Sequence, residues 1–215
     1  MSCTTPTRVQ IRIHGRGGQG VVSAAEMLSI AAFLEGRYAQ AFPSFGSERM
    51  GAPVMAFCRI SDRPIRLREP VTNPDALIIQ DPTLLQQVSL FEGLQPDGFV
   101  LINSARSLEE LNLASFLKNL PRKHTLTVPA TELAMRHVGR PLPNSTLLGG
   151  FAAMTGELRL ASVLAAIRQK FSGKIGESNA AAAQEAYDLV TQCMPIPPLD
   201  SLTRRTREEA HVEAD

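Results

Sequence analysis

Residues 9–28 read VQIRIHGRGGQGVVSAAEML and set the beginning of the fold. The run 9–14 alternates apolar and polar side chains, which is typical of a half-buried strand. Gly15-Arg16-Gly17-Gly18-Gln19-Gly20 follows, and its glycines allow sharp turns and close approach of the backbone to a ligand. A helix pattern starts next, and the N–H groups at a helix N-terminus attract anions. The stretch therefore predicts a strand, a phosphate-binding turn and a helix.

The glycine spacing also satisfies the dinucleotide motif G-x-G-x-x-G, through Gly15, Gly17 and Gly20. That motif requires an acidic residue about 20 residues further on, where it holds a ribose hydroxyl. The next strand-like run, 37–42, instead ends in Phe42-Pro43. No Lys-Ser/Thr pair follows Gly20, so the P-loop motif is absent as well. The alternative to phosphate binding is a turn that only packs the helix tightly on the strand.

Composition excludes several classes of protein. The formal net charge of the 215 residues is +1, which gives no electrostatic reason to bind nucleic acid or an anionic membrane. No apolar run approaches the ~20 residues of a membrane span, and the N-terminus does not read as a signal peptide. Cys3, Cys58 and Cys193 lie far apart without a CxxC or Cys/His cluster. We therefore expect a cytoplasmic chain with free thiols and no metal site.

Short apolar runs alternate with helix patterns along the middle of the chain. The runs 76–80 and 99–103 are typical of buried parallel strands, and 125–128 is expected to form another strand. Between and after them the sequence predicts helices at 81–91, 107–120 and 129–138, in addition to the first helix at about 19–35. One stretch interrupts the alternation of strands and helices. A strand at 54–60 is followed by a turn at 61–64, and residues 65–67 could pair with that strand as a β-hairpin.

The last part of the chain is helical, with helices expected at 144–155, 158–171 and 177–194. Gly149-Gly150 inside the first of these favours close packing over a ligand approach. The expected fold is α/β: a mostly parallel open sheet flanked by helices, Rossmann-like, with a β-hairpin insertion and a helical C-terminal part. Residues 1–194 form one domain, and 195–215 form an extended or disordered tail, because this tail has too little apolar area to fold alone.

Few side chains are placed as catalytic groups. His14 lies at a strand end, but no Ser, Cys or acid is arranged with it as a triad, so a packing role is favoured. Asp81 follows a strand, where open α/β sheets bind ligands, but an N-cap ahead of Pro82 is the favoured role. Glu48-Arg49, in a loop rich in proline and glycine, either meets a ligand or another subunit or is only solvated. We expect no catalytic residue in this chain, which favours a binding or structural subunit.

Five segments resemble, in order, the gamma subunit of 2-oxoacid:ferredoxin oxidoreductases of the pyruvate:ferredoxin oxidoreductase type. They are residues 15–20, 38–54, 59–62, 73–75 and 143–149, and the longest, YAQAFPSFGSERMGAPV, is the most specific. The resemblance implies a subunit of a complex that oxidatively decarboxylates a 2-oxoacid, pyruvate by default, to acyl-CoA and CO2 and passes electrons to ferredoxin. Alternatives are an aryl or branched 2-oxoacid such as phenylglyoxylate with NAD as final acceptor, or a non-catalytic nucleotide-binding or structural subunit.

The resemblance also implies which groups lie elsewhere. Thiamine diphosphate is expected between the alpha and beta subunits, and [4Fe-4S] clusters in the beta and ferredoxin-like delta subunits. The electron acceptor is ferredoxin or a flavin/NAD subunit. The loops 15–20 and 46–51 are the ligand-side segments, with candidate cofactor-binding residues Gly15, Arg16, Gly17, Gly18, Gln19, Gly20, Ser47, Glu48 and Arg49. Phosphates of coenzyme A suit helix N–H groups with Arg16 or Arg49 nearby, although both loops could instead only shape a subunit interface.

Overall fold

The computed structural model describes residues 8–44, 50–67, 69–86, 89–113, 120–121 and 124–193. Its strands are β1 (Arg8–Arg16), β2 (Tyr38–Pro43), β3 (Pro53–Ser61), β4 (Ala76–Ile79), β5 (Phe99–Asn103) and β6 (Thr125–Val128). Its helices are α1 (Val21–Leu34), the short 3-10 helix η1 (Pro82–Gln86), α2 (Ala130–Val138), α3 (Asn144–Thr155), α4 (Leu160–Lys170) and α5 (Gly173–Cys193). The candidates Ser47, Glu48 and Arg49, as well as the expected tail 195–215, lie outside the described residues.

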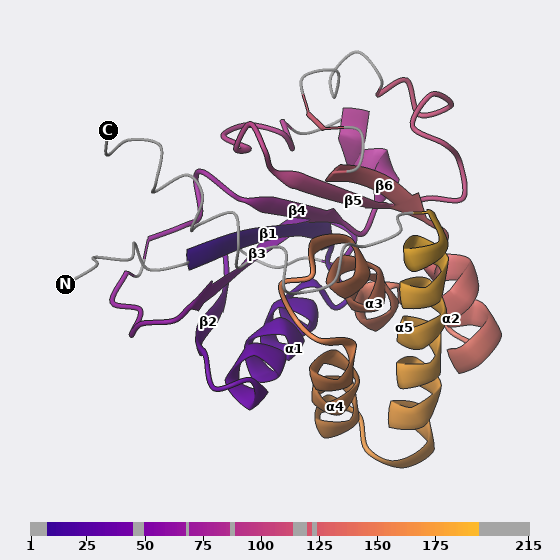
Figure 1. The fold of residues 1–215 in the computed structure, drawn as a ribbon. Helices are drawn as coiled ribbons and strands as arrows, with labels where there is room; N and C mark the ends of the chain where they lie inside the picture. Colours follow the sequence, from indigo (N-terminus) through magenta and orange to yellow (C-terminus); the bar gives the residue numbers. More distant parts are fainter. Residues whose placement is uncertain are drawn as a thin grey trace.

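The six strands form one mixed sheet in the order β2-β3-β1-β4-β5-β6 (Figure 1). Strands β1, β4, β5 and β6 run parallel, and β3 runs antiparallel to both β1 and β2. The predicted α/β class is confirmed, with β1 at the centre of the sheet. The carboxyl ends of the four parallel strands therefore meet along one edge, which is where open α/β sheets place their ligands. We call it the carboxyl edge.

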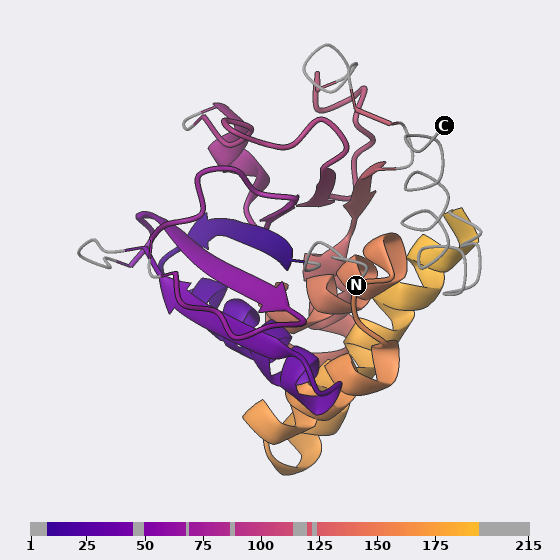
Figure 2. The same cartoon turned by 60° about the vertical axis from the view of Figure 1, so that its left-hand side comes forward.

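The predicted hairpin partner of the strand at 54–60 is wrong. Residues 65–67 form no strand, and β3 pairs instead with β2, from Tyr38 opposite Ser61 to Pro43 opposite Ala56. Its other side pairs with β1 along its whole length. A buried strand needs backbone partners on both sides, and the three residues after Pro64 are too few to serve a strand of nine. The antiparallel pair β2–β3 packs on α1 (Figure 2).

Two predicted helices are not seen in the described parts of their ranges. Within 81–86 and 89–91 the helical residues are those of η1, and residues 107–113 form turns. The carbonyl oxygens of Leu90 and Glu92 accept hydrogen bonds from the Arg12 guanidinium, so they are drawn toward the sheet. Asn112 has a positive φ of 57°, which ends a right-handed helical turn. Long-range contacts and one backbone conformation thus replace the predicted helices.

The two faces of the sheet are covered differently. Helices α1–α5 all lie on one face, whereas η1 and the segments around it lie on the other (Figure 1). Alternate residues of one strand serve both faces: Ile78 packs in the core under the helices, while Leu77 and Ile79 pack against Leu84 and Leu90. This burial on both faces confirms the interpretation of 76–80 and 99–103 as buried parallel strands, β4 and β5.

Candidate functional site

The glycine loop lies at the carboxyl edge, between β1 and α1. Gly18 and Gly20 have φ values of 94° and 72°, a conformation in which a side chain is strained. Gly17 fastens the loop to the start of β3, since its N–H donates to the Ala52 carbonyl at 2.9 Å and its own carbonyl accepts from the Gly51 N–H at 3.1 Å. The predicted strand, turn and helix are confirmed here.

A polar cluster braces this loop from the end of β4. The carboxylate of Asp81 accepts hydrogen bonds from Gln19 Nε2 at 2.9 Å and from Arg16 Nε at 3.1 Å. The Arg16 guanidinium also donates to Thr83 Oγ1 at 2.7 Å and to the Gly51 carbonyl at 3.0 Å. Arg16 is therefore held against the protein, with 23% of its side chain exposed. It contributes positive charge beside the loop, partly neutralised by Asp81.

Three helices begin at this edge: α1 after Gly20, α2 after Pro129 and α3 after Pro143. The Asn103 side chain accepts the Thr131 N–H at the start of α2, whereas α1 and α3 have no side-chain cap. The starts of α1 and α3 touch, because a Cβ on Gly20 would lie 2.4 Å from Asn144 Nδ2. Within the described part of the chain, no acceptor binds the N–H groups of Gly18, Gly20, Val21 or Val22. Unpaired N–H groups at helix starts create a positive potential that favours anions.

Beneath the loop lies an amide that sequence reasoning missed. The Gln80 side chain is 1% exposed, and neither its Oε1 nor its Nε2 has a hydrogen-bond partner among the described residues. Its Oε1 lies 3.2 Å from the position of a Cβ on Gly15. An unpaired buried polar group costs about 1–3 kcal/mol. Only the pairing of β1 with β4 brings Gln80 to the loop, so no local sequence signal marks it.

Asp81 fills the capping role that its sequence position favoured, and it also bonds to the glycine loop. One carboxylate oxygen accepts the Thr83 N–H at 3.0 Å, which is the expected capping bond at the start of η1. The other oxygen holds Gln19 and Arg16 at the glycine loop. The sequence signal was its place after a strand, and the structure adds that this strand is the neighbour of β1.

His14 is a packing residue, as expected. It is 3% exposed, and its Nε2 accepts a hydrogen bond from Arg12 Nε at 3.0 Å. Burial, together with the positive charge of Arg12, lowers the pKa of His14 to about 3. The imidazole is therefore neutral near pH 7 and committed to Arg12, which makes it unsuitable as a base for a ligand at the glycine loop.

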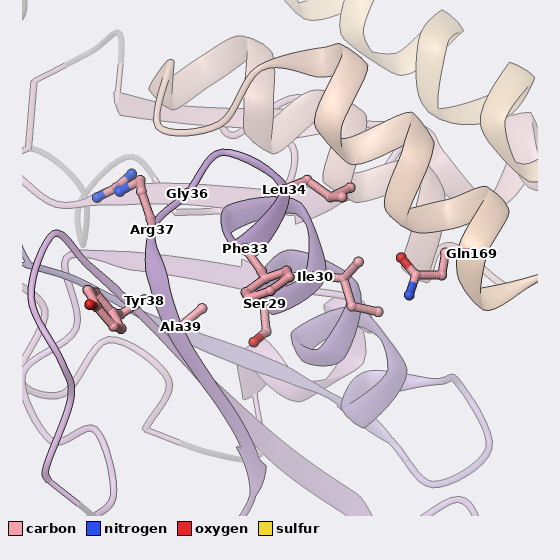
Figure 3. A pocket seen from close by; sticks show the side chains of 9 residues that line it. All are labelled: Ser29, Ile30, Phe33, Leu34, Gly36, Arg37, Tyr38, Ala39 and Gln169. Atoms are coloured by element: carbon pink, nitrogen blue, oxygen red, sulfur yellow. The ribbon is translucent and has the colours of Figure 1, made fainter.

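A hollow of about 750 Å³ lies at the opposite end of α1 (Figure 3). Its wall is mainly apolar, with Phe33 and Leu34 from α1 and Tyr38 from β2 all well exposed. Arg37 at its rim is already bonded to Glu157 and ion-paired with Asp62. Because ligand sites need converging polar groups, the carboxyl edge is the stronger candidate site.

The comparison with protein families identifies the chain. The family model described as pyruvate ferredoxin/flavodoxin oxidoreductase matches residues 10–189. This chain belongs to that family. It is 48% identical over 180 residues to the pyruvate/ketoisovalerate oxidoreductases common subunit gamma of Pyrococcus abyssi, covering 84% of this chain and 96% of the relative. It is 51% identical over 181 residues to the pyruvate synthase subunit PorC of Methanosarcina barkeri, with the same coverage.

Solved structures agree with this assignment. The pyruvate oxidoreductase subunit PORC of Thermotoga maritima aligns with a TM-score of 0.71 at 36% identity, covering 84% of this chain and 96% of that one. The gamma subunit of a keto/oxoacid ferredoxin oxidoreductase from Geobacter sulfurreducens has the same fold, with a TM-score of 0.66 at 24% identity, 86% of this chain and 98% of that one being covered. The predicted family and gamma-subunit type are confirmed, and the chain is a subunit of an oxidoreductase.

No group of His, Cys, Asp or Glu among the residues that the structure describes is arranged to hold a metal ion. Likewise, none of the described helices combines the length and apolarity needed to cross a membrane.

Proposed function

We propose that this chain acts in the cytoplasm as the gamma subunit of a complex that converts pyruvate and coenzyme A to acetyl-CoA and CO2. The two electrons released pass to ferredoxin. Alpha, beta and delta subunits are the partners, with thiamine diphosphate and [4Fe-4S] clusters held by them. Near full-length similarity to subunits whose names specify pyruvate supports this choice of substrate. Ketoisovalerate, named with pyruvate in the Pyrococcus abyssi relative, is the second candidate substrate.

The part of this chain in the reaction is to receive the phosphates of coenzyme A at the carboxyl edge. The observation that carries this proposal is the pair of touching helix starts, α1 and α3, neither of which has a side-chain cap. The exposed Gly18 N–H and the first N–H groups of α1 supply donors. Arg16 adds charge close by, and Arg49, which precedes Met50 in the sequence, is the second arginine that the sequence offers for the phosphates. Phosphate oxygens match such donors well.

The test replaces Gly18 by Ala in the assembled complex. Gly18→Ala places a side chain at φ 94°, which strains the loop backbone, while the exposed Met50 side chain can move away from the new Cβ. We expect the KM for coenzyme A to rise about tenfold, equivalent to about 1.4 kcal/mol, while the KM for pyruvate stays unchanged. Arg49→Ala should raise the same KM by weakening charge attraction.

The matched control is Gly139→Ala. Gly139 also has a positive φ, 75°, but a Cβ there meets nothing within 4 Å. It should therefore cost stability without changing the KM for coenzyme A. Unchanged coenzyme A affinity in correctly assembled Gly18→Ala and Arg49→Ala complexes would remove the phosphate role and favour a purely interfacial one. A panel of 2-oxoacids in the same assay decides the substrate.

A further inference from the structure

We infer that Asp81 is a positioning residue for coenzyme A, acting through Gln19 and Arg16 on the glycine loop. The inference rests on the proposed function, because it assumes that the loop receives a phosphate. Asp81 itself would not touch the ligand. A carboxylate beside a phosphate-binding loop is electrostatically unfavourable for the anion, so its presence there calls for a separate physical reason.

Asp81 is almost saturated with hydrogen bonds. Its Oδ2 accepts from Gln19 and Arg16, and its Oδ1 accepts from the Thr83 N–H at 3.0 Å and from the Thr83 hydroxyl at 2.6 Å. Its side chain is only 12% exposed. Four donors from two segments, the glycine loop and the start of η1, therefore converge on one carboxylate. Such charge-assisted bonds are roughly twice as strong as bonds between neutral groups.

Gln19 transmits this constraint to the loop backbone. While its Nε2 donates to Asp81, its Oε1 accepts the Arg16 N–H at 2.8 Å. The Gln19 N–H in turn donates to the Arg16 carbonyl at 3.0 Å. The amide of Gln19 also fills the space left by the missing side chain of Gly15, because a Cβ there would lie 3.0 Å from Gln19 Oε1. Asp81 thus fixes the turn from which Gly18 presents its N–H.

The charge state of Asp81 fits this role. Burial opposes ionisation, but the hydrogen bonds from Thr83 and Gln19 and the charge of Arg16 outweigh it and hold the pKa of Asp81 below its usual value. Asp81 therefore accepts from all its donors as an anion at neutral pH. Asparagine has nearly the same shape, but its NH2 group would face the donors of Gln19 and Arg16 or of Thr83.

Substitution by Asn separates two opposite expectations. If Asp81 were only a nearby negative charge, Asp81→Asn would remove repulsion and lower the KM for coenzyme A. If it positions the loop, the same change raises that KM. In the assembled complex we expect a rise of about fivefold to tenfold, with kcat and the KM for the 2-oxoacid unchanged.

Asp75→Asn is the matched control, since Asp75 precedes the same strand β4 at its other end. It accepts the Gln10 N–H at 2.7 Å, far from the glycine loop. It should lower the thermal stability of the complex and leave the KM for coenzyme A as it is. Gln19→Leu is the second variant, and it should raise the KM as Asp81→Asn does. Combining Gln19→Leu with Asp81→Asn should then add little, because the two residues act through one chain of bonds.

The outcomes keep this inference distinct from the proposed function. If the KM for coenzyme A rises in Gly18→Ala but is unchanged or lower in Asp81→Asn and Gln19→Leu, the positioning role is overturned and the phosphate role stands. An unchanged KM for coenzyme A in all of these variants would overturn both the positioning role and the phosphate role. Additive effects of Gln19→Leu and Asp81→Asn would also contradict the inference, because they would mean that Asp81 acts independently of Gln19.

Discussion

The Cα of Gly149 on α3 faces the carbonyl oxygen of Ala183 on α5 so closely that a Cβ would lie 1.8 Å from that oxygen. The two helices are therefore in backbone contact. Gly149→Ala should lower the free energy of unfolding by about 1–3 kcal/mol or more, because the helices must move apart. Urea denaturation of the chain measures this cost.

The neighbouring glycine is its control. A Cβ on Gly150 would meet Leu101, Val128 and Val190 at 3.5 Å, which is ordinary contact. Gly150→Ala should be neutral or should stabilise the chain by up to about 1 kcal/mol through helix propensity. Equal destabilisation by both substitutions would contradict the backbone contact. The close packing that the sequence suggested for Gly149-Gly150 therefore requires glycine at Gly149 and not at Gly150.

Acid should destabilise the chain through His14. Its pKa is about 3 in the folded protein and about 6.5 as the ordinary value. Below pH 6.5 the unfolded chain gains a proton that the folded chain does not. The free energy of unfolding therefore decreases as the pH is lowered from 6.5 toward 3, by at most about 1.4 kcal/mol per pH unit. His14→Gln keeps an acceptor for Arg12 without titrating. Its unfolding free energy should fall less steeply between pH 6.5 and 4, and parallel pH profiles would refute the assignment.

The buried ion pair of Arg37 and Glu157 should behave as a unit. Their side chains are 17% and 18% exposed, and burial raises the pKa of Glu157 while Arg37 opposes that rise. Arg37→Met leaves a buried carboxylate without its cation and should cost about 3–5 kcal/mol. The double variant Arg37→Met with Glu157→Leu should recover most of that loss. A double-mutant cycle in urea tests the pair, and strict additivity would show that the two side chains are not coupled.

Arg12 should stabilise the segment around Leu90 and Glu92, which covers the face of the sheet opposite the helices. Its guanidinium donates to the Leu90 carbonyl at 2.8 Å and to the Glu92 carbonyl at 2.7 Å. Arg12→Met leaves both oxygens without this donor, and hydrogen bonds to charged groups contribute about 1.5–3 kcal/mol each. Amide hydrogen exchange should accelerate around residues 89–98 more than in α3. Uniform acceleration throughout the chain would instead indicate global destabilisation.

Local patterns were sufficient to predict most strands and helices. The runs at 76–79 and 99–102 are strands with apolar residues on both faces, and that property can be read without knowing their neighbours. Strand pairing could not be read in this way. The partner of β3 comes from 38–43 rather than from 65–67, because pairing depends on which segment can lie alongside a whole strand.

The candidate site was predicted in part for the same reason. The glycine loop is visible in the sequence, since glycine at positive φ and a following helix are both local features. Gln80 and Asn144 reach the loop only through the sheet order and the packing of α3, so no local pattern places either beside the loop, although Asn144 lies in the family-like segment 143–149. Arg12 shows the same limit, because its bonds to the segment around Leu90 replaced a helix that local patterning had favoured.

The central place of β1 has a consequence for the order in which the protein is made. When β1 leaves the ribosome, its two neighbours in the sheet, β3 and β4, are still to come, and the helix that touches its glycine loop begins only at Asn144. Such distant contacts form slowly, because the intervening chain must first be brought together. A nascent chain that stops before α3 would therefore carry the glycine motif without the helix start that touches it. The glycine loop is thus synthesised early but is among the last segments to acquire its native surroundings.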